Sequence, residues 1–310
     1  MPQLFIVTGK GGTGKTTIAA AMAQRAAAEG RRVLLVELAA DRSIGLLFGR
    51  RHLNAEPTPL APRLTGVRVE PRALLEAYFN RLLRLPFLTR RLFASVTFNA
   101  VTTAAPGVSE FLILDNLLQW VDSRTFTRRR SYDLVILDGP ATGHAHRLLR
   151  TPRQLATMVP GGPIGSSARR LLALLADHER TQIVLVAIPD EMAINETLEA
   201  HAMLTDDLAM HVARPVLNRI VPRRFNASEA EAVRALSAAH PHDPVLRAAR
   251  LSIAGRQNVE RHQARLRRGF GITPIGIRQI TADAPARSDL EHIGAVLWRG
   301  LSSERAHGQE

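Results

Sequence analysis

The sequence contains no cysteine among its 310 residues. This absence excludes disulfides, thiolate zinc sites, iron–sulfur clusters and a cysteine nucleophile. Aromatic residues are also scarce, at 5%, so any core must consist mainly of Leu, Val, Ile and Ala. No apolar run reaches the length of a membrane-spanning helix without an interrupting charged residue or proline. The N-terminus leads straight into an apolar run with no room for a signal peptide, so we expect a cytoplasmic protein.

Positive charge dominates, because 41 basic residues face 28 acidic ones and give a net charge of +13. This balance favours anionic partners such as nucleic acid, acidic lipid or nucleotide. Nucleic acid is disfavoured, because no basic cluster alternates with aromatic stacking residues. Only two basic residues are lysines, Lys10 and Lys15, and both lie in one glycine-rich loop. A compact ammonium group suits a tight phosphate-binding loop better than a guanidinium does.

Strand and helix patterns alternate along the chain. Residues 4–8 and 32–38 form apolar runs typical of buried parallel strands, and an alanine-rich helix pattern at 16–29 lies between them. The pattern predicts an α/β fold, a mostly parallel, doubly wound sheet with helices on both faces. We expect one domain over residues 1–302, with a helical insertion at about 43–130 and a frayed polar tail at 303–310. Further strands are expected at 66–70, 132–137, 181–188, 214–221 and 271–280, and helices at 191–209, 228–239 and 287–300.

The loop after the first strand is the most informative segment. It reads Gly9-Lys10-Gly11-Gly12-Thr13-Gly14-Lys15-Thr16-Thr17. It matches the phosphate-binding pattern G-x-x-x-x-G-K-[ST] between a strand and a helix, which predicts a P-loop NTPase with ATP or ADP as ligand. The glycines allow backbone N–H groups to point at phosphate oxygens. Lys15 is expected to reach the β- and γ-phosphates and Thr16 to bind Mg²⁺.

An acidic residue follows a second apolar strand pattern. Asp138 ends the run Tyr132-Asp133-Leu134-Val135-Ile136-Leu137. A carboxylate at the carboxyl end of a parallel strand is the expected second Mg²⁺ contact in such a site. The segment Gly139-Pro140-Ala141-Thr142-Gly143-His144 comes next, and Arg147-Leu148-Leu149 follows it.

These motifs together resemble one family. The sequence Gly-Lys-Gly-Gly-x-Gly-Lys-Thr resembles the deviant Walker A motif of SIMIBI-class P-loop ATPases. Thr142-Gly143-His144 resembles switch II of the arsenite-pump and tail-anchored protein targeting ATPases, whereas partition ATPases lack it. Two weaker matches are residues 188–197, which end in Glu196-Thr197, and residues 216–219. The resemblance implies that Lys10 crosses a dimer interface to the partner's nucleotide and that Asn218 contacts adenine.

The sequence departs from the family pattern in two respects. Relatives carry an aspartate after the second strand that positions the attacking water, whereas this sequence has Ala39 there. We rank Glu37 ahead of Asp41 as its substitute and expect either slow hydrolysis or a paralogous subunit that carries the full site. The missing cysteines exclude arsenite binding through thiols and a Cys-x-x-Cys zinc clamp between subunits.

The sequence predicts a dimeric ATPase that couples its nucleotide state to binding of a protein client or a membrane-associated partner, together with itself or a paralogous subunit. The insertion is the expected effector region, where residues 82–88 and 111–114 either line a hydrophobic groove or pack on the core. The alternative function is a nucleotide-dependent scaffold or partition-like protein with weak hydrolysis that binds DNA or an envelope assembly.

Overall fold

The computed structural model describes residues 3–38, 44–83, 107–123, 130–281 and 285–307. Eight strands form one sheet in the order β3-β4-β2-β5-β1-β6-β7-β8. Apart from the antiparallel β3–β4 pair, the pairings between the described strands are parallel, which confirms the predicted fold class. The strands are β1 (Leu4–Gly9), β2 (Val33–Leu38), β3 (Thr58–Ala61), β4 (Leu64–Val69), β5 (Leu134–Ala141), β6 (Thr181–Ala187), β7 (Val216–Ile220) and β8 (Ile275–Arg278).

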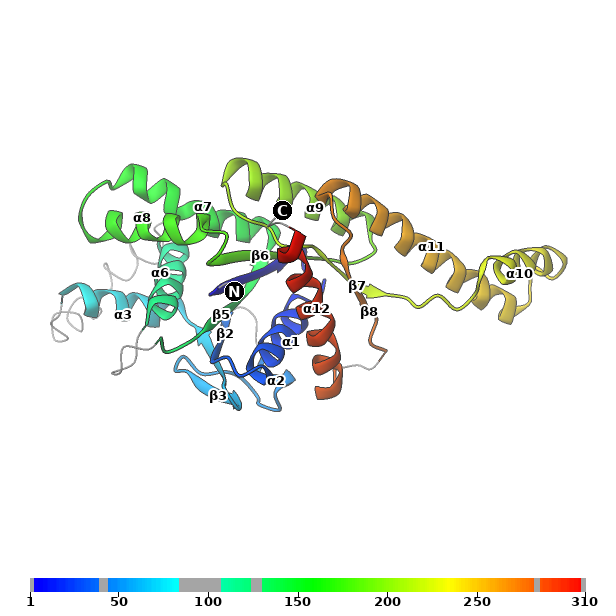
Figure 1. Cartoon of the computed structure of the whole chain (residues 1–310), viewed down its shortest axis with the longest axis horizontal. Coiled ribbons are helices and arrows are strands. Elements are labelled where there is room, and N and C mark those ends of the chain that lie inside the picture. The colour runs from blue at the N-terminus through cyan, green and yellow to red at the C-terminus, as the bar shows by residue number, and fades with distance from the viewer. Residues whose placement is uncertain (1–2, 39–43, 84–106, 124–129, 282–284, 308–310) are drawn as a thin grey trace.

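Helices cover both faces of this sheet (Figure 1). The side chains of β1 explain the two layers, because Leu4 and Ile6 join one apolar cluster while Phe5 and Val7 join the other. This alternation is the period of a strand that is buried on both faces. The helices are α1 (Lys15–Ala28), α2 (Ile44–Leu47), α3 (Pro71–Leu83), α6 (Val108–Asp122), α7 (Thr142–Met158), α8 (Gly162–Ala176), α9 (Glu191–Ala202), a π-helical turn (Met203–Asp207), α10 (Ala227–Ala239), α11 (Pro244–Phe270) and α12 (Arg287–His307).

Each cluster draws on a different set of helices. The alanine-rich α1 is buried from Ile18 to Ala23 between the sheet and α12. Helices α6, α7 and α8 supply leucines to the opposite cluster. At the amino ends of β2 and β5, the Arg32 guanidinium donates hydrogen bonds to the Asp133 carboxylate and joins the two strands. The sheet therefore has two packed faces, and its carboxyl edge is left for the loops.

The described part of segment 43–130 contains more strand than predicted. It supplies β3 and β4, of which only β4 matches an expected strand, at 66–70. The short β3 contains Pro59 and lies at the edge of the sheet, where the N–H group that proline lacks is not needed for strand pairing. Because proline is unusual in strands, the sequence of β3 gave no indication of a strand. Residues 111–114 lie in the core or against it. This supports the alternative in which the segment packs on the core and does not line a groove. The expected groove residues 84–88 lie outside the described residues.

Five helical segments depart from the sequence predictions. Helices α7, α8 and α11 were not predicted, although Asp243 followed by Pro244 is a usual helix start and Asp243 does cap α11. The predicted helix 191–209 gives way to a π-helical turn after Ala202. The expected frayed tail is helical as far as His307. None of the helices in the described parts of the chain is long and apolar enough to span a bilayer.

Candidate nucleotide-binding site

The loop between β1 and α1 has the backbone of a phosphate-binding arc. Gly12 and Gly14 adopt φ angles of 80° and 92°, in the left-handed region that favours glycine. The buried Thr13 fixes the arc from inside, because its hydroxyl donates a 2.9 Å hydrogen bond to the Lys10 carbonyl oxygen. Gly11 is exposed. The loop therefore holds its shape while one side stays accessible to a ligand.

Two glycines let the strand ends approach each other closely. A Cβ atom on Gly9 would lie 2.1 Å from the Val186 carbonyl oxygen of β6. A Cβ atom on Gly139 would lie 2.7 Å from the Val7 carbonyl oxygen of β1. Neither distance is possible for real atoms, so a side chain at either position would push the strands apart. The first loop glycine is thus required by strand packing as well as by phosphate binding.

Lys15 begins α1 and turns back over the loop. Its Nζ donates a 3.2 Å hydrogen bond to the Lys10 carbonyl oxygen, so the ammonium group lies on the concave side of the arc. Thr16 and Thr17 follow in the first turn of α1, and both are half-buried. The positive end of the helix dipole and the Lys15 charge reinforce each other there, which favours a phosphate group.

Thr16 and Asp138 come together as the sequence predicts. The Thr16 hydroxyl donates a 2.6 Å hydrogen bond to Asp138 Oδ2, and Asp138 is 2% exposed. Asp138 lies on β5 in register with Val7 of β1, which puts the carboxylate directly beneath the loop. Hard hydroxyl and carboxylate oxygens fit Mg²⁺, which takes its other ligands from phosphates and water. The described residues hold no group of three or more His, Asp or Glu side chains that could bind a metal ion.

Glu37 lies beside Asp138 at the carboxyl edge. It occupies the position on β2 that is in register with Asp138 on β5, and it is fully buried. Its Oε1 accepts a 2.7 Å hydrogen bond from the Ile44 backbone N–H. Glu37 thus ties the start of α2 to the sheet. Ala39 and Asp41 lie outside the described residues, so the comparison of Glu37 with Asp41 stays a prediction.

Asn218 supports the loop from β7. Its Nδ2 donates a 2.8 Å hydrogen bond to the Thr13 carbonyl oxygen, and its Oδ1 accepts one from the Arg219 backbone N–H. A Cβ atom on Gly14 would lie 2.4 Å from the same Nδ2, which explains a glycine at that position. Contact between Asn218 and adenine stays a prediction, whereas its contact with the loop is a property of the fold.

Lys10 makes an ion pair that sequence reasoning missed. Its Nζ lies 2.5 Å from Glu196 Oε1 on α9, and the two side chains are 27% and 35% exposed. Glu196 Oε2 accepts a 3.2 Å hydrogen bond from the hydroxyl of Thr142, the first residue of α7. One carboxylate therefore connects the loop lysine to the start of α7. The only sequence signal for it was the weak Glu196-Thr197 match.

His144 lies apart from this network. It is exposed in the first turn of α7, where its Nδ1 is 2.6 Å from an Arg147 guanidinium nitrogen. Arg147 also pairs with Glu110 of α6 at 3.3 Å. These contacts fit a role in holding the start of α7 in place.

Comparison with known proteins agrees with this geometry. Residues 2–160 match the family model described as anion-transporting ATPase. The ATPase BagA of Mycobacterium tuberculosis is 32% identical over 232 residues, which cover 73% of this chain and 68% of the relative. The arsenical pump-driving ATPase of Acidiphilium multivorum is 29% identical over 326 residues, covering 99% of this chain and 50% of that protein. The one from Escherichia coli is 27% identical over 249 residues, covering 74% and 41%.

The matched region spans the loop, Glu37, Asp138 and the first turn of α7, which the fold brings to one edge of the sheet. The chain spans about half the length, or less, of these two arsenical pump-driving relatives. The family match therefore covers the phosphate-binding loop, Glu37 and Asp138 within a single sheet. On the family match and on this arrangement of Lys15, Thr16 and Asp138, the chain belongs to the anion-transporting ATPase family, the ArsA-type group of P-loop ATPases.

Proposed function

We propose that this ATPase works as a dimeric switch, in which the nucleotide state controls binding of a protein or membrane-associated partner. The observation that carries the proposal is the chain of contacts from Lys10 through Glu196 to Thr142. It joins the phosphate-binding loop to α9 and to the segment after Asp138. A conformational change at the loop would then be transmitted to α9 and α7, two helices that lead away from the site.

Lys10 has two possible acceptors in this scheme. Within its own protomer it pairs with Glu196. To stabilise charge on the nucleotide of a neighbouring protomer, it must leave Glu196 and cross the interface. Since one carboxylate holds both Lys10 and Thr142, departure of Lys10 would remove one of the two contacts that hold Glu196 beside the start of α7. Dimer formation would then change the restraint on the start of α7.

The chemical step needs a group that orients the attacking water. Glu37 is our candidate, because its carboxylate is buried and lies in register with Asp138. Its hydrogen bond to the Ile44 backbone N–H also restrains it, so we expect hydrolysis to be slow until the segment between β2 and α2 rearranges. Mg²⁺, when bound near Thr16 and Asp138, would supply neutralisation of the phosphate charge.

Two lysine variants test the proposal. Lys15→Ala should abolish ATP binding measured by calorimetry, because the loop loses its phosphate contact. Lys10→Ala should bind ATP nearly as well as the wild type but fail to dimerise and turn over. Full ATPase activity of Lys10→Ala as a monomer would refute the role of Lys10 across the interface. Tight ATP binding by the wild type without phosphate release would instead favour the scaffold function.

Glu37→Gln and Asp41→Asn test the hydrolytic step. We expect Glu37→Gln to lower turnover at least tenfold without changing ATP affinity, and Asp41→Asn to have little effect. Unchanged turnover in both variants would remove both acids from the mechanism. Thermal denaturation of each variant separates a chemical effect from loss of the buried contact to Ile44.

A further inference from the structure

The helices α10 and α11 form a hairpin, residues 221–270, that extends from the sheet at β7 (Figure 1). The 27 residues of α11 make it about 40 Å long. Its buried residues, Val259, His262 and Leu266, all lie in the half nearest the sheet. In α10 only Ser237 is buried. The outer half of the hairpin therefore has little contact with the rest of the described chain.

This hairpin carries a large share of the protein's charge. Its 50 residues include ten arginines and four carboxylates, a net charge of +6 out of +13 for the whole chain. Three of the four carboxylates serve the fold itself. Glu229 and Asp243 cap α10 and α11, and Glu260 pairs with Arg223 and Arg256. Arg265 pairs with Glu191 of α9, and the other seven arginines form no ion pair with a residue that the structure describes.

The outer end, residues 234–251, which we call the tip, also exposes apolar side chains. Val245 is 73% exposed, Leu251 66% and Leu236 51%. They are three of the eight large apolar side chains left exposed among the described residues, concentrated in eighteen positions. Arg247 and Arg250 lie among them and make no ion pair with any residue that the structure describes. The tip thus combines exposed aliphatic side chains with arginines.

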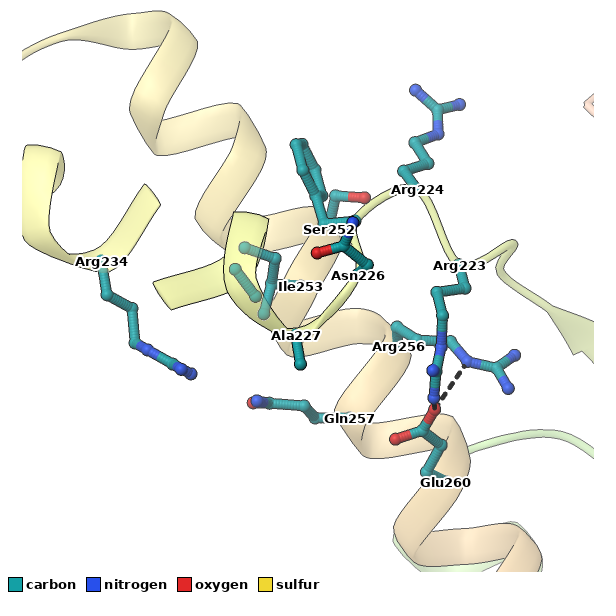
Figure 2. A pocket seen from close by; sticks show the side chains of 12 residues that line it. Arg223, Arg224, Asn226, Ala227, Arg234, Ser252, Ile253, Arg256, Gln257 and Glu260 are labelled. Carbon is teal, nitrogen blue, oxygen red and sulfur yellow. Dashed lines mark hydrogen bonds and ion pairs between the residues drawn. The ribbon is translucent and has the colours of Figure 1, made fainter. Parts of the chain in front are cut away.

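A cavity of about 240 Å³ between α10 and α11 is a less suitable anion site (Figure 2). Its lining includes four arginines, but Glu260 already pairs with two of them, Arg223 and Arg256. Arg224 points away from the other lining side chains in Figure 2. The remaining cation, Arg234, belongs to the tip. The tip therefore holds three arginines, Arg234, Arg247 and Arg250, that form no ion pair with a residue that the structure describes.

We infer that the tip docks end-on into a bilayer surface that contains anionic phospholipid. Val245 and Leu251 are six residues apart, so they project about 120° apart around α11. A single protein face would cover only one of them, whereas headgroups surround the tip on all sides. Leu251 lies about 10 Å from the start of α11, and this matches the 5–10 Å to which interfacial helices enter a bilayer.

The arginines complete the match to a lipid surface. At this depth the Arg247 and Arg250 guanidinium groups can reach lipid phosphates while their stems lie beside acyl chains. The tip contains no Phe, Tyr or Trp on which a base could stack, which argues against single-stranded nucleic acid. The docking does not depend on the proposed ATP switch, because no residue of the tip lies in the nucleotide site.

Vesicle flotation tests the inference. The full chain should float with vesicles containing phosphatidylglycerol, remain unbound with pure phosphatidylcholine vesicles, and bind less as salt rises. Arg247→Gln/Arg250→Gln should weaken partitioning about 30-fold, which corresponds to about 1 kcal/mol for each arginine. Leu251→Ser should weaken it about tenfold. Lys15→Ala should float like the wild type, so failure of the ATP switch and failure of docking give different results.

Arg267→Gln/Arg268→Gln is the matched control, since it removes the same charge from exposed positions at the sheet end of α11. We expect it to change partitioning less than threefold. Equal losses in both double variants would overturn the inference, because they would indicate general attraction by the net charge. Failure to float with anionic vesicles would overturn it too. So would binding to DNA or polyglutamate as strong as binding to vesicles, which would point to another macromolecule.

Discussion

The ion pair between Lys10 and Glu196 offers the sharpest test of the switch. Glu196→Gln keeps an amide oxygen that can accept a hydrogen bond from Lys10, and its NH2 group can donate to the Thr142 hydroxyl oxygen. It abolishes the charge attraction that holds Lys10 within its own protomer. If Lys10 must leave Glu196 for the dimer to close, the variant should close more easily. We therefore expect tighter ATP-dependent self-association.

The magnitude follows from the exposure of the pair. With about a third of each side chain exposed, the pair should contribute about 0.2–1 kcal/mol. A homodimer breaks two such pairs on closing, so the gain is about 0.4–2 kcal/mol, or roughly 2- to 30-fold in the dimer dissociation constant. A dimer with a paralogous subunit breaks one pair and gains at most about fivefold.

Sedimentation velocity with a non-hydrolysable ATP analogue and Mg²⁺ measures this constant. Glu29→Gln is the matched control, because Glu29 forms a similarly exposed pair with Arg25 far from the loop. The double variant Lys10→Ala/Glu196→Gln should associate no better than Lys10→Ala, since the effect requires both partners. Unchanged or weaker association of Glu196→Gln, or a gain that persists without Lys10, would refute the reasoning.

Three further predictions concern the supports of the site and the sheet. Thr16→Ala should remove the Mg²⁺ dependence of ATP affinity and leave affinity in EDTA unchanged, as calorimetry would show. Asn218→Ala removes a donor from the Thr13 carbonyl oxygen and should lower the free energy of unfolding by about 1–3 kcal/mol in urea titrations. The side-chain hydrogen bonds from Arg32 lower the pKa of Asp133 to about 2, so this pair stabilises the fold above pH 4 and loses its effect as the pH falls toward 2. Asp133→Asn should flatten that part of the stability profile by less than about 1 kcal/mol, since the pair is partly exposed, and an unchanged profile would contradict the assignment.

The sequence by itself determined the fold class and the centre of the site. The strand before Gly9, the helix after Lys15 and the strand before Asp138 are each continuous in the sequence, so local pattern sufficed to place them. Parallel strands gather their carboxyl ends at one edge, and this rule alone predicts that the loop and Asp138 meet. The contact between Thr16 and Asp138 confirms that prediction.

Tertiary structure decided which distant side chains meet at that edge. Glu196 lies 186 residues from Lys10, and Asn218 lies 205 residues from Thr13, yet both pairs are in contact. The order and register of the strands determine these contacts, and local hydrophobic periodicity predicts neither the order nor the register. Helix α11 was missed for a related reason, whereas α10 was predicted at 228–239. Only Val259, His262 and Leu266 of α11 are buried, so the helix lacks the broad apolar stripe by which a helix that covers a sheet is recognised in sequence.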